Sequence, residues 1–364
     1  METIKVKLKD NPYNIYLEYN LTKRVPFFIE KLNLGNYGII LASQKVYSLY
    51  KKLLRGVFKK NYYFLPVIDG ERAKSKKWLF KVINEIIKID KWCRKIFLVC
   101  VGGGSITDLG GFVASIYKRG IPYVHIPTTL LCQIDASIGG KTAINLKEAK
   151  NILGTFHQPK AVFIDPIFLK TIAKKEIREG IAEAIKYGII KDKSFFYFLK
   201  RYHREIISLE TSYILKLIFT CAKIKTNIVE EDEKEKKGVR TLLNFGHTFA
   251  HALESTYRYR KVSHGEAVAI GMVFAAYLSY FMGKCSFNKV EEIKEIMHLF
   301  SLPIRFSFDY LTLYKSINYD KKFISGKIRM VLLKEIGKVE VAEDIPPMVL
   351  RECLKKFSRM RPKF

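Results

Sequence analysis

Apolar residues in the first 165 positions follow two alternating periods, which predict strands and helices in turn. Short apolar runs bounded by turn residues predict strands, and segments with apolar residues three or four apart predict helices. The expected strands are 38–43, 62–68, 96–101, 123–126 and 161–164, with helices at 47–58 and 74–89 and a strand-like alternation over 1–20. This order indicates a mostly parallel sheet with right-handed crossovers.

After position 166 the apolar period changes to that of helices, about 3.6 residues. Helices are expected over 175–190, 195–209, 213–233, 241–256, 264–282 and 289–300, and a short hairpin over 327–333 and 339–341. We therefore expect an α/β Rossmann-like nucleotide-binding domain over 1–165 and an all-α C-terminal domain over 166–364.

The composition is that of a globular chain, with 48% hydrophobic and 27% charged residues. No uncharged apolar run reaches the roughly 18 residues of a membrane span, and the N-terminus has no apolar signal core. The six cysteines are scattered without a C-x-x-C pair, which favours reduced thiols over disulfides or a thiolate zinc site. We expect a cytoplasmic protein with no membrane contact.

The formal charge of +29 favours anionic substrates. Lysine outnumbers arginine and is spread along the whole chain, and Phe, Tyr, Ile and Asn are abundant. An A/T-rich coding sequence would produce this composition. Because no aromatic-basic module of a known RNA- or DNA-binding type occurs, we expect a small anionic substrate and no specific nucleic acid.

A glycine-rich loop follows the expected strand 96–101. Residues 102–105, GGGS, open an apolar helix that carries Asp108 in its next turn. Glycine allows backbone N–H groups to approach an anion closely, and the helix adds its positive end. The loop does not match G-x-G-x-x-G, because Thr107 takes the place of the third glycine. We expect it to bind a pyrophosphate, with Asp108 either contacting the nucleotide or capping the helix.

The sequence GGKT at 139–142 ends like a Walker A motif, but Asp135 stands where the first glycine would be. A P-loop is therefore excluded. Lys141 on a glycine turn remains a good phosphate ligand, and Lys150 and Asn151 follow it. Two anion-binding loops this close in sequence indicate a region that holds several phosphates.

Three of the seven histidines lie close together in the helical half, at His247, His251 and His264. His247 and His251 have i,i+4 spacing and share one helix face, as two ligands of one metal would. Glu183 is a candidate third ligand, because it interrupts an apolar helix where an unpaired charge is costly. Spacing alone selects His247, His251 and Glu183 and leaves His264 open. Such ligands suit catalytic zinc or cobalt.

Four cationic residues flank the metal candidates: Arg119, Lys186, Lys225 and Arg240. Lys186 follows Glu183 by three positions and shares its helix face. Each residue alone is typical of a solvated charge, but together they suit a cleft that binds an anion.

Taken together, these motifs resemble the 3-dehydroquinate synthase family of sugar phosphate cyclases. They occur in order over nearly the whole chain: GGGSITDLGGF, YKRG, IPTTLLCQIDASIGGKTAIN, KNILGTFHQP, GIAEAIKYGII, LLNFGHTFAHALE, SHGEAVAIGM and DKKFISGKIRMVLLKEIG. The glycine loop alone is shared with glycerol dehydrogenase and iron-type alcohol dehydrogenases. Its combination with GGKTAIN and NFGHTFAHALE is more specific.

The resemblance implies a dehydroquinate synthase-like fold and a lyase of the shikimate pathway that acts on 3-deoxy-D-arabino-heptulosonate 7-phosphate. Bound NAD would oxidise the C5 alcohol, phosphate would be eliminated, and NADH would return the hydride. Ring opening and an intramolecular aldol step would then give 3-dehydroquinate. The first domain would bind NAD, and the second would bind Zn²⁺ or Co²⁺ and the substrate.

Carried over by motif position, the resemblance also implies a role for each matching residue. The metal ligands would be Glu183, His247 and His264, whereas His251 would orient a proton-transfer network. The NAD contacts would be Glu71, Lys74, Gly103, Gly104, Ser105, Asp108, Thr128, Thr129, Lys141 and Lys150. The substrate contacts would be Lys141, Asn151, Lys186 and Arg119 at the phosphate, Arg240 at the carboxylate, and Lys225, Glu235, Asn244 and one of Lys321 and Lys322 around them. A homodimer is implied, because Arg119 would reach in from a partner subunit.

One position departs from the family pattern. Ser43 stands where the family usually has Asn or Asp at the adenosine ribose, and its short hydroxyl implies a contact through water or none.

Three other functions fit part of the sequence. They are another sugar phosphate cyclase that forms an inosose or a valiolone, an NAD-dependent polyol dehydrogenase, and a nucleic-acid-binding protein on an inactive scaffold. Arg240 and Asn244 favour a substrate with a carboxylate over the first. The second class lacks GGKTAIN, and the intact metal and phosphate residues argue against the third.

Overall fold

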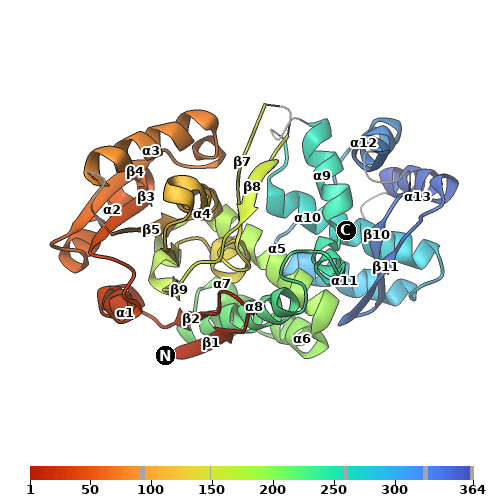
Figure 1. Ribbon diagram of the computed structural model, residues 1–364. Coiled ribbons are helices and arrows are strands. Elements are labelled where there is room, and N and C mark those ends of the chain that lie inside the picture. Colours follow the sequence, from red (N-terminus) through yellow and green to blue (C-terminus); the bar gives the residue numbers. More distant parts are fainter. Residues whose placement is uncertain (91–94, 148, 258–260, 323–326, 361–364) are drawn as a thin grey trace. The chain divides into compact units, whose positions relative to one another are not determined.

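A computed structural model of the chain describes residues 1–90, 95–147, 149–257, 261–322 and 327–360, without the side chains of 318–322. The chain forms two compact units. The first unit comprises Met1–Ala173 and Thr211–Lys234, and the second comprises Lys174–Glu210 and Glu235–Phe364. Figure 1 labels most of their helices and strands. Within the described residues, no helix is both long and apolar enough to cross a membrane.

The first unit is built on a seven-stranded sheet of order β1-β2-β9-β6-β5-β3-β4. Only β1 runs antiparallel to its neighbour, so the predicted parallel sheet is confirmed. The strands are β1 (Glu2–Val6), β2 (Tyr13–Leu17), β3 (Tyr37–Ser43), β4 (Tyr62–Val67), β5 (Ile96–Gly102), β6 (Tyr123–Pro127) and β9 (Ala161–Ile164).

Helices cover both faces of this sheet (Figure 1). Alternate residues of β3 point to opposite faces, so Ile39 packs with α3 and α4 while Ile40 packs with α1 and α2. These helices are α1 (Val25–Leu32), α2 (Gln44–Val57), α3 (Lys76–Asp90) and α4 (Gly104–Ile116), with short turns η1 (Leu21–Arg24), η2 (Glu71–Ala73), η3 (Tyr117–Arg119), η4 (Cys132–Ala136) and η5 (Pro166–Thr171). The sheet is therefore doubly wound, as the strand and helix order predicted.

A small hairpin of β7 (Lys141–Ile144) and β8 (Leu153–Phe156) lies beside α4 and was not among the predicted elements. The hydroxyl groups of Thr142 and Thr155 are 2.9 Å apart, and Thr155 donates to Ser115 of α4 at 2.8 Å. A Cβ at Gly111 of α4 would lie 2.4 Å from the side chain of Thr142. Glycine at this position therefore allows the hairpin that begins with Lys141 to pack closely on α4.

Helix α8 (Thr211–Glu231) belongs to the first unit, although it lies in the second half of the sequence. It contacts β1, η4 and η5. The units therefore differ from the predicted ranges in two ways: the first continues past 165 to Ala173, and it includes a helix that was assigned to the 166–364 domain.

The second unit is helical apart from the predicted hairpin. Its elements are α5 (Lys174–Lys191), α6 (Lys193–Arg201), α7 (His203–Ile207), η6 (Val239–Asn244), α9 (His247–Thr256), α10 (His264–Phe281), α11 (Phe287–Leu299), α12 (Tyr310–Lys322), β10 (Met330–Glu335), β11 (Lys338–Ala342) and α13 (Pro347–Arg359). Almost wholly buried, α10 contacts α5, α9, α11, α13 and β10. The predicted helix 241–256 is interrupted at Gly246, whose φ of 80° is left-handed.

Candidate active site

The glycine loop lies at the carboxyl edge of the parallel sheet, between β5 and α4. Gly102 is paired with Pro127 of β6, and the N–H of Thr128 donates to the Gly102 carbonyl at 2.9 Å. Gly103 is the N-cap of α4, and no side chain caps this helix. The N–H groups of its first turn therefore lack the usual side-chain acceptor and can receive an anion.

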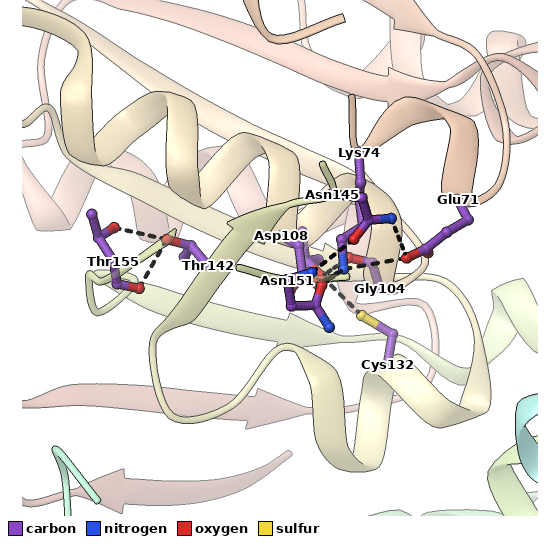
Figure 2. A network of polar contacts seen from close by, with 10 residues as sticks. Glu71, Lys74, Gly104, Asp108, Cys132, Thr142, Asn145, Asn151 and Thr155 are labelled. Carbon is purple, nitrogen blue, oxygen red and sulfur yellow. Dashed lines mark hydrogen bonds and ion pairs between the residues drawn. The ribbon is translucent and has the colours of Figure 1, made fainter. Parts of the chain in front are cut away.

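A polar cluster surrounds the ammonium of Lys74 (Figure 2). Its Nζ lies 2.6 Å from Oδ2 of Asp108 on α4 and also donates to Oδ1 of Asn151. Asn145 joins the other members, because it donates to Glu71 at 2.8 Å and accepts the Asn151 N–H at 2.9 Å. Lys74 is 4% exposed. The cluster around it combines residues from three parts of the chain: those that follow β4, those on α4 and those that follow β7.

Burial and charge act in opposite directions on Lys74. Burial lowers the pKa of Lys74, but the carboxylates of Asp108 and Glu71 outweigh this effect and raise the pKa above its usual value. Burial also raises the pKa of Asp108, and the Lys74 ammonium opposes that rise. Lys74 therefore carries its positive charge at neutral pH, beside the glycine loop's helix.

A second buried lysine, Lys225 of α8, lies against the π-helical turn η4. Its Nζ donates to the backbone oxygen of Asp135 at 2.7 Å and contacts the Asp135 carboxylate. Asp135 is the residue that breaks the Walker A pattern. In the folded chain this carboxylate pairs with one of the predicted site residues.

The other candidates of the first unit lie on loops and element ends. Thr128 and Thr129 follow β6 beside the glycine loop, and Thr128 is buried. Lys141 begins β7 and Lys150 lies between β7 and β8, both exposed. Ser43 is the N-cap of α2, and its hydroxyl accepts a hydrogen bond from the Val46 N–H at 3.2 Å.

Arg119 lies on a strained turn. It and Lys118 both have left-handed backbones, with φ of 63° and 48°. Buried Asp90 holds the turn, because it accepts a hydrogen bond from Tyr117 at 2.8 Å and pairs with Lys118 at 2.5 Å. Arg119 itself is exposed and makes no hydrogen bond or ion pair within the described residues.

In the second unit, three predicted residues from three helices converge. Glu183 lies in the middle of α5, His247 begins α9 and His264 begins α10. Their ligand atoms all lie within 4.8 Å of one another. Two imidazoles and one carboxylate at this spacing are the donor set of a catalytic zinc site with an open position.

Glycine contacts allow the three helices to come this close. A Cβ at Gly265 of α10 would lie 2.4 Å from the Cα of Glu179 on α5. One at Gly271 would lie 2.1 Å from the carbonyl oxygen of Gly246, directly before α9. Any larger residue would separate α10 from the helices that carry Glu183 and His247.

One lysine and two imidazoles surround the buried carboxylate of Glu183. His247 Nε2 and His264 Nε2 lie 3.3 and 3.8 Å from its Oε1, and Lys186 contacts its Oε2. Burial would raise the pKa of Glu183, but Lys186 and His247 hold it well below its usual range. Neither oxygen accepts a well-directed hydrogen bond from the described residues. An ionised, poorly hydrogen-bonded carboxylate suits a bound cation.

His251 and Glu254 extend the cluster along α9. The His251 ring centre lies 5.6 Å from that of His247 and 6.4 Å from that of His264, but His251 is outside the compact donor set. Oε2 of the buried Glu254 lies 3.4 Å from Nδ1 of His264. Burial lowers the pKa of His264, but Glu254 and Glu183 outweigh it and raise the pKa above its usual value.

The remaining candidates of the second unit lie around η6. Arg240 is 3% exposed, and its Nε lies 3.4 Å from Oε1 of Glu235. Asn244 ends η6 and is exposed. Lys321 and Lys322 fall in the last turn of α12, where side chains lie outside the described residues.

Sequence reasoning missed three residues of these clusters: Asn145, Asp135 and Glu254. Asn145 and Asp135 lie within the motif IPTTLLCQIDASIGGKTAIN, but their spacing does not separate them from its other residues. Glu254 has one, because it follows His247 by seven positions and so lies on the same face of α9.

The chain matches two family models and many proteins of one family. The model for the 3-dehydroquinate synthase N-terminal region matches residues 64–179, and that for the C-terminal region matches 180–323. The 3-dehydroquinate synthase of Dictyoglomus turgidum is 42% identical over 356 residues, 98% of each chain. That of Syntrophotalea carbinolica is 39% identical over 98% of this chain and 99% of its own.

Solved structures of related cyclases share the fold. The 2-epi-5-epi-valiolone synthase of Streptomyces hygroscopicus subsp. jinggangensis, solved with NAD⁺ and Zn²⁺ bound, is 26% identical with a TM-score of 0.87, over 97% of this chain and 98% of its own. A 2-deoxy-scyllo-inosose synthase, solved with carbaglucose-6-phosphate, NAD⁺ and Co²⁺, has a TM-score of 0.87 at 22% identity over 98% and 100%. The expected fold class is thereby confirmed. By its family models and its full-length relatives, the chain belongs to the 3-dehydroquinate synthase family.

Proposed function

We propose that the protein is a 3-dehydroquinate synthase, a lyase that converts 3-deoxy-D-arabino-heptulosonate 7-phosphate to 3-dehydroquinate and phosphate. The observation that carries this proposal is the convergence of Glu183, His247 and His264, because two imidazoles and a carboxylate form the donor set of a catalytic divalent metal site. Full-length relatives with this name at about 40% identity support the choice of reaction.

The second unit would hold the metal. Glu183, His247 and His264 suit Zn²⁺ or Co²⁺, which, when bound, polarises substrate hydroxyl and carbonyl oxygens. Lys186 forms an ion pair with Glu183 and would place a positive charge beside the reacting centre. His251, next to both ligand imidazoles, would orient proton transfer. Buried Arg240 would bind the substrate carboxylate, with Glu235 and Asn244 nearby.

The first unit would hold NAD, which supplies reversible hydride transfer when bound. The uncapped first turn of α4, with Gly103, Gly104 and Ser105, suits the pyrophosphate. Asp108, Lys74 and Glu71 would line the nucleotide with Thr128, Thr129 and Lys150. Lys141 and Asn151 would contact phosphate, Lys225 would add a buried cation, and the charged Lys74 supports an anionic ligand here.

We also propose a homodimer, in which β8 is covered by a second copy. All four residues of β8 are exposed, and one of its edges is unpaired in the β7–β8 sheet. Three apolar side chains are exposed there, Ile152 at 64%, Leu153 at 43% and Phe156 at 45%. An exposed apolar edge strand favours association. Arg119, without a described partner, would then reach the phosphate site of the other copy.

Sedimentation at micromolar protein tests this interface. The double variant Leu153→Lys, Phe156→Lys is expected to be monomeric, because it places two charges on the strand that the second copy would cover. The matched control, Ile207→Lys, changes an equally exposed apolar residue of the second unit and should remain dimeric. A monomeric wild type would contradict the proposal.

We place the enzyme in the cytosol. Among the described residues five cysteines are free, and four of them are buried. Unpaired thiols are typical of a reducing compartment.

Turnover tests the function directly. Purified protein with NAD⁺, Zn²⁺ or Co²⁺ and the heptulosonate phosphate is expected to release phosphate and dehydroquinate in equal amounts. The same assay with other sugar phosphates tests the inosose- and valiolone-forming alternatives, and net NADH accumulation would indicate a polyol dehydrogenase. No turnover with metal and NAD⁺ restored would refute the proposal.

A further inference from the structure

The imidazole of His264 lies between two buried carboxylates. Its Nε2 is 3.8 Å from Oε1 of Glu183, and its Nδ1 is 3.4 Å from Oε2 of Glu254. The side chain of Glu183 is 1% exposed and that of Glu254 is 6% exposed. Each ring nitrogen of His264 therefore faces a different acid, on a different helix.

In His247 and His264, the two histidines of the donor set, Nδ1 faces an acceptor of a different kind. Nδ1 of His247 faces the backbone oxygen of Phe245 at 3.3 Å, and its Nε2 faces Glu183. Nδ1 of His264 faces Glu254 instead of a backbone oxygen. An acceptor at Nδ1 keeps the proton there and leaves the Nε2 lone pair directed at the centre.

Glu254 also links the helices that carry both histidines. It lies on α9, two helical turns after His247, and contacts the first residue of α10. Burying a carboxylate is costly unless it is paired, and His264 is one partner of Glu254. His264 begins its helix, where a side chain has fewer neighbours to fix its ring than one in mid-helix. The contact with Glu254 fixes this ring.

We propose that Glu254 is a positioning residue for the metal site: it holds His264 in the tautomer and orientation that present Nε2 for coordination. This inference rests on the proposed function of Glu183, His247 and His264 as metal ligands. Glu254 itself supplies no ligand atom, since it is outside the donor set.

Metal affinity of the apoprotein tests this role without an activity assay. Zn²⁺ dissociation constants are measured by competition with a chromogenic chelator, and the visible spectrum of bound Co²⁺ reports ligand geometry. The variants are Glu254→Ala, which removes the acceptor, and Glu254→Gln, which keeps an oxygen acceptor without the charge. Glu266→Gln is the matched control: it removes a nearby acid from α10, and Gln preserves the capping box with Ser263.

Glu254→Ala is expected to weaken Zn²⁺ binding by about 10- to 100-fold and to alter the Co²⁺ spectrum. Glu254→Gln should lose less affinity, and Glu266→Gln should match the wild type. A purely structural role would lower the melting temperature of the apoprotein and leave the Zn²⁺ affinity and Co²⁺ spectrum unchanged, which would overturn the inference. If the wild type binds no metal, the proposed metal site fails as well, so the two failures are distinguishable.

Discussion

A buried lysine is stable only where its ammonium has acceptors, and in the described part of the chain Lys74, Lys186 and Lys225 are buried. Each contacts a carboxylate, of Asp108, Glu183 and Asp135 respectively. The composition of the chain accounts for its many exposed lysines but not for these. Buried charged pairs at the carboxyl edge of a sheet and beside a metal donor set are typical of functional sites.

His264 and His251 should differ in metal retention. His264→Ala removes one of three donors and should abolish stoichiometric Zn²⁺ after dialysis, whereas His251→Ala should retain zinc and lose rate by about 10²- to 10⁴-fold, as expected for proton transfer. Metal analysis of both dialysed variants, with turnover measured in parallel, checks this. Equal zinc loss in both would favour the i,i+4 pair His247 and His251 as ligands.

His125, 3% exposed on β6, should make the protein less stable in mild acid. Burial lowers the pKa of His125 to about 3, below its unfolded value of about 6.5. The unfolded chain therefore binds a proton that the folded chain does not, and stability falls as the pH drops below that unfolded value. At pH 5 the loss is about 2 kcal/mol.

Chemical denaturation at pH 5 and at pH 7.5 measures how far the free energy of unfolding depends on pH. In His125→Phe, which cannot be protonated at this position, the difference between the two pH values should be smaller by about 2 kcal/mol, whatever the variant does to stability at neutral pH. An unchanged difference would show that other groups cause it.

At the level of elements, the periodic pattern of apolar residues predicted the strands and helices that bury one continuous face. The strands of the parallel sheet and the long helices of the second unit were predicted within a few residues, because each buries a continuous apolar face. The hairpin β7–β8 was missed because β8 is wholly exposed and includes Gly154. Helices α12 and α13 were also missed, and both are more polar on average than the buried α10.

The proposed metal donor set could not be predicted from spacing. The i,i+4 rule places His247 and His251 on one face of α9, but the closest third donor comes from the start of α10. That approach depends on Gly246 and Gly271, which meet only in the folded unit. The resemblance to the family's motifs implied Glu183, His247 and His264, and these are the three residues that the structure brings together.

Gly271→Ala should therefore disturb both stability and metal binding. The added Cβ would lie 2.1 Å from the Gly246 carbonyl oxygen, so α9 and α10 must separate. We expect a loss of about 1–3 kcal/mol or more and weaker Zn²⁺ binding. The control is Gly56→Ala on α2, where no atom lies within 4 Å of the new Cβ and helix propensity predicts equal or slightly higher stability. Melting temperatures and chelator competition measure both; equal behaviour of the two variants would contradict this account.

At the scale of the whole molecule, the order of elements along the chain does not predict which elements belong to which compact unit. Period and composition placed every helix after 166 in one domain, yet α8 packs on β1, η4 and η5. Only long-range contacts, such as that between Lys225 and Asp135, assign this helix to the first unit. No local pattern encodes them.

A fragment of residues 1–173 should accordingly be unstable. It lacks α8, on which Ile214, Leu217, Ile218, Ile228 and Val229 are buried. At about 1.5–3 kcal/mol for each such side chain, their loss is comparable to the whole stability of a typical domain. Joining 211–234 to residue 173 through a flexible linker should restore a cooperative unfolding transition by circular dichroism. Cooperative unfolding of 1–173 alone would show that α8 is dispensable.

The position of α8 in the sequence also fixes the order in which the protein is synthesised. Helices α5 to α7 of the second unit leave the ribosome before α8, so the sheet unit remains incomplete while the other has already begun. Domains usually fold one after another, N-terminal first. Here Glu183 is translated before the sheet unit is finished, and His247 and His264 only afterwards. The sheet unit can therefore be completed only after the first helices of the second unit have been synthesised.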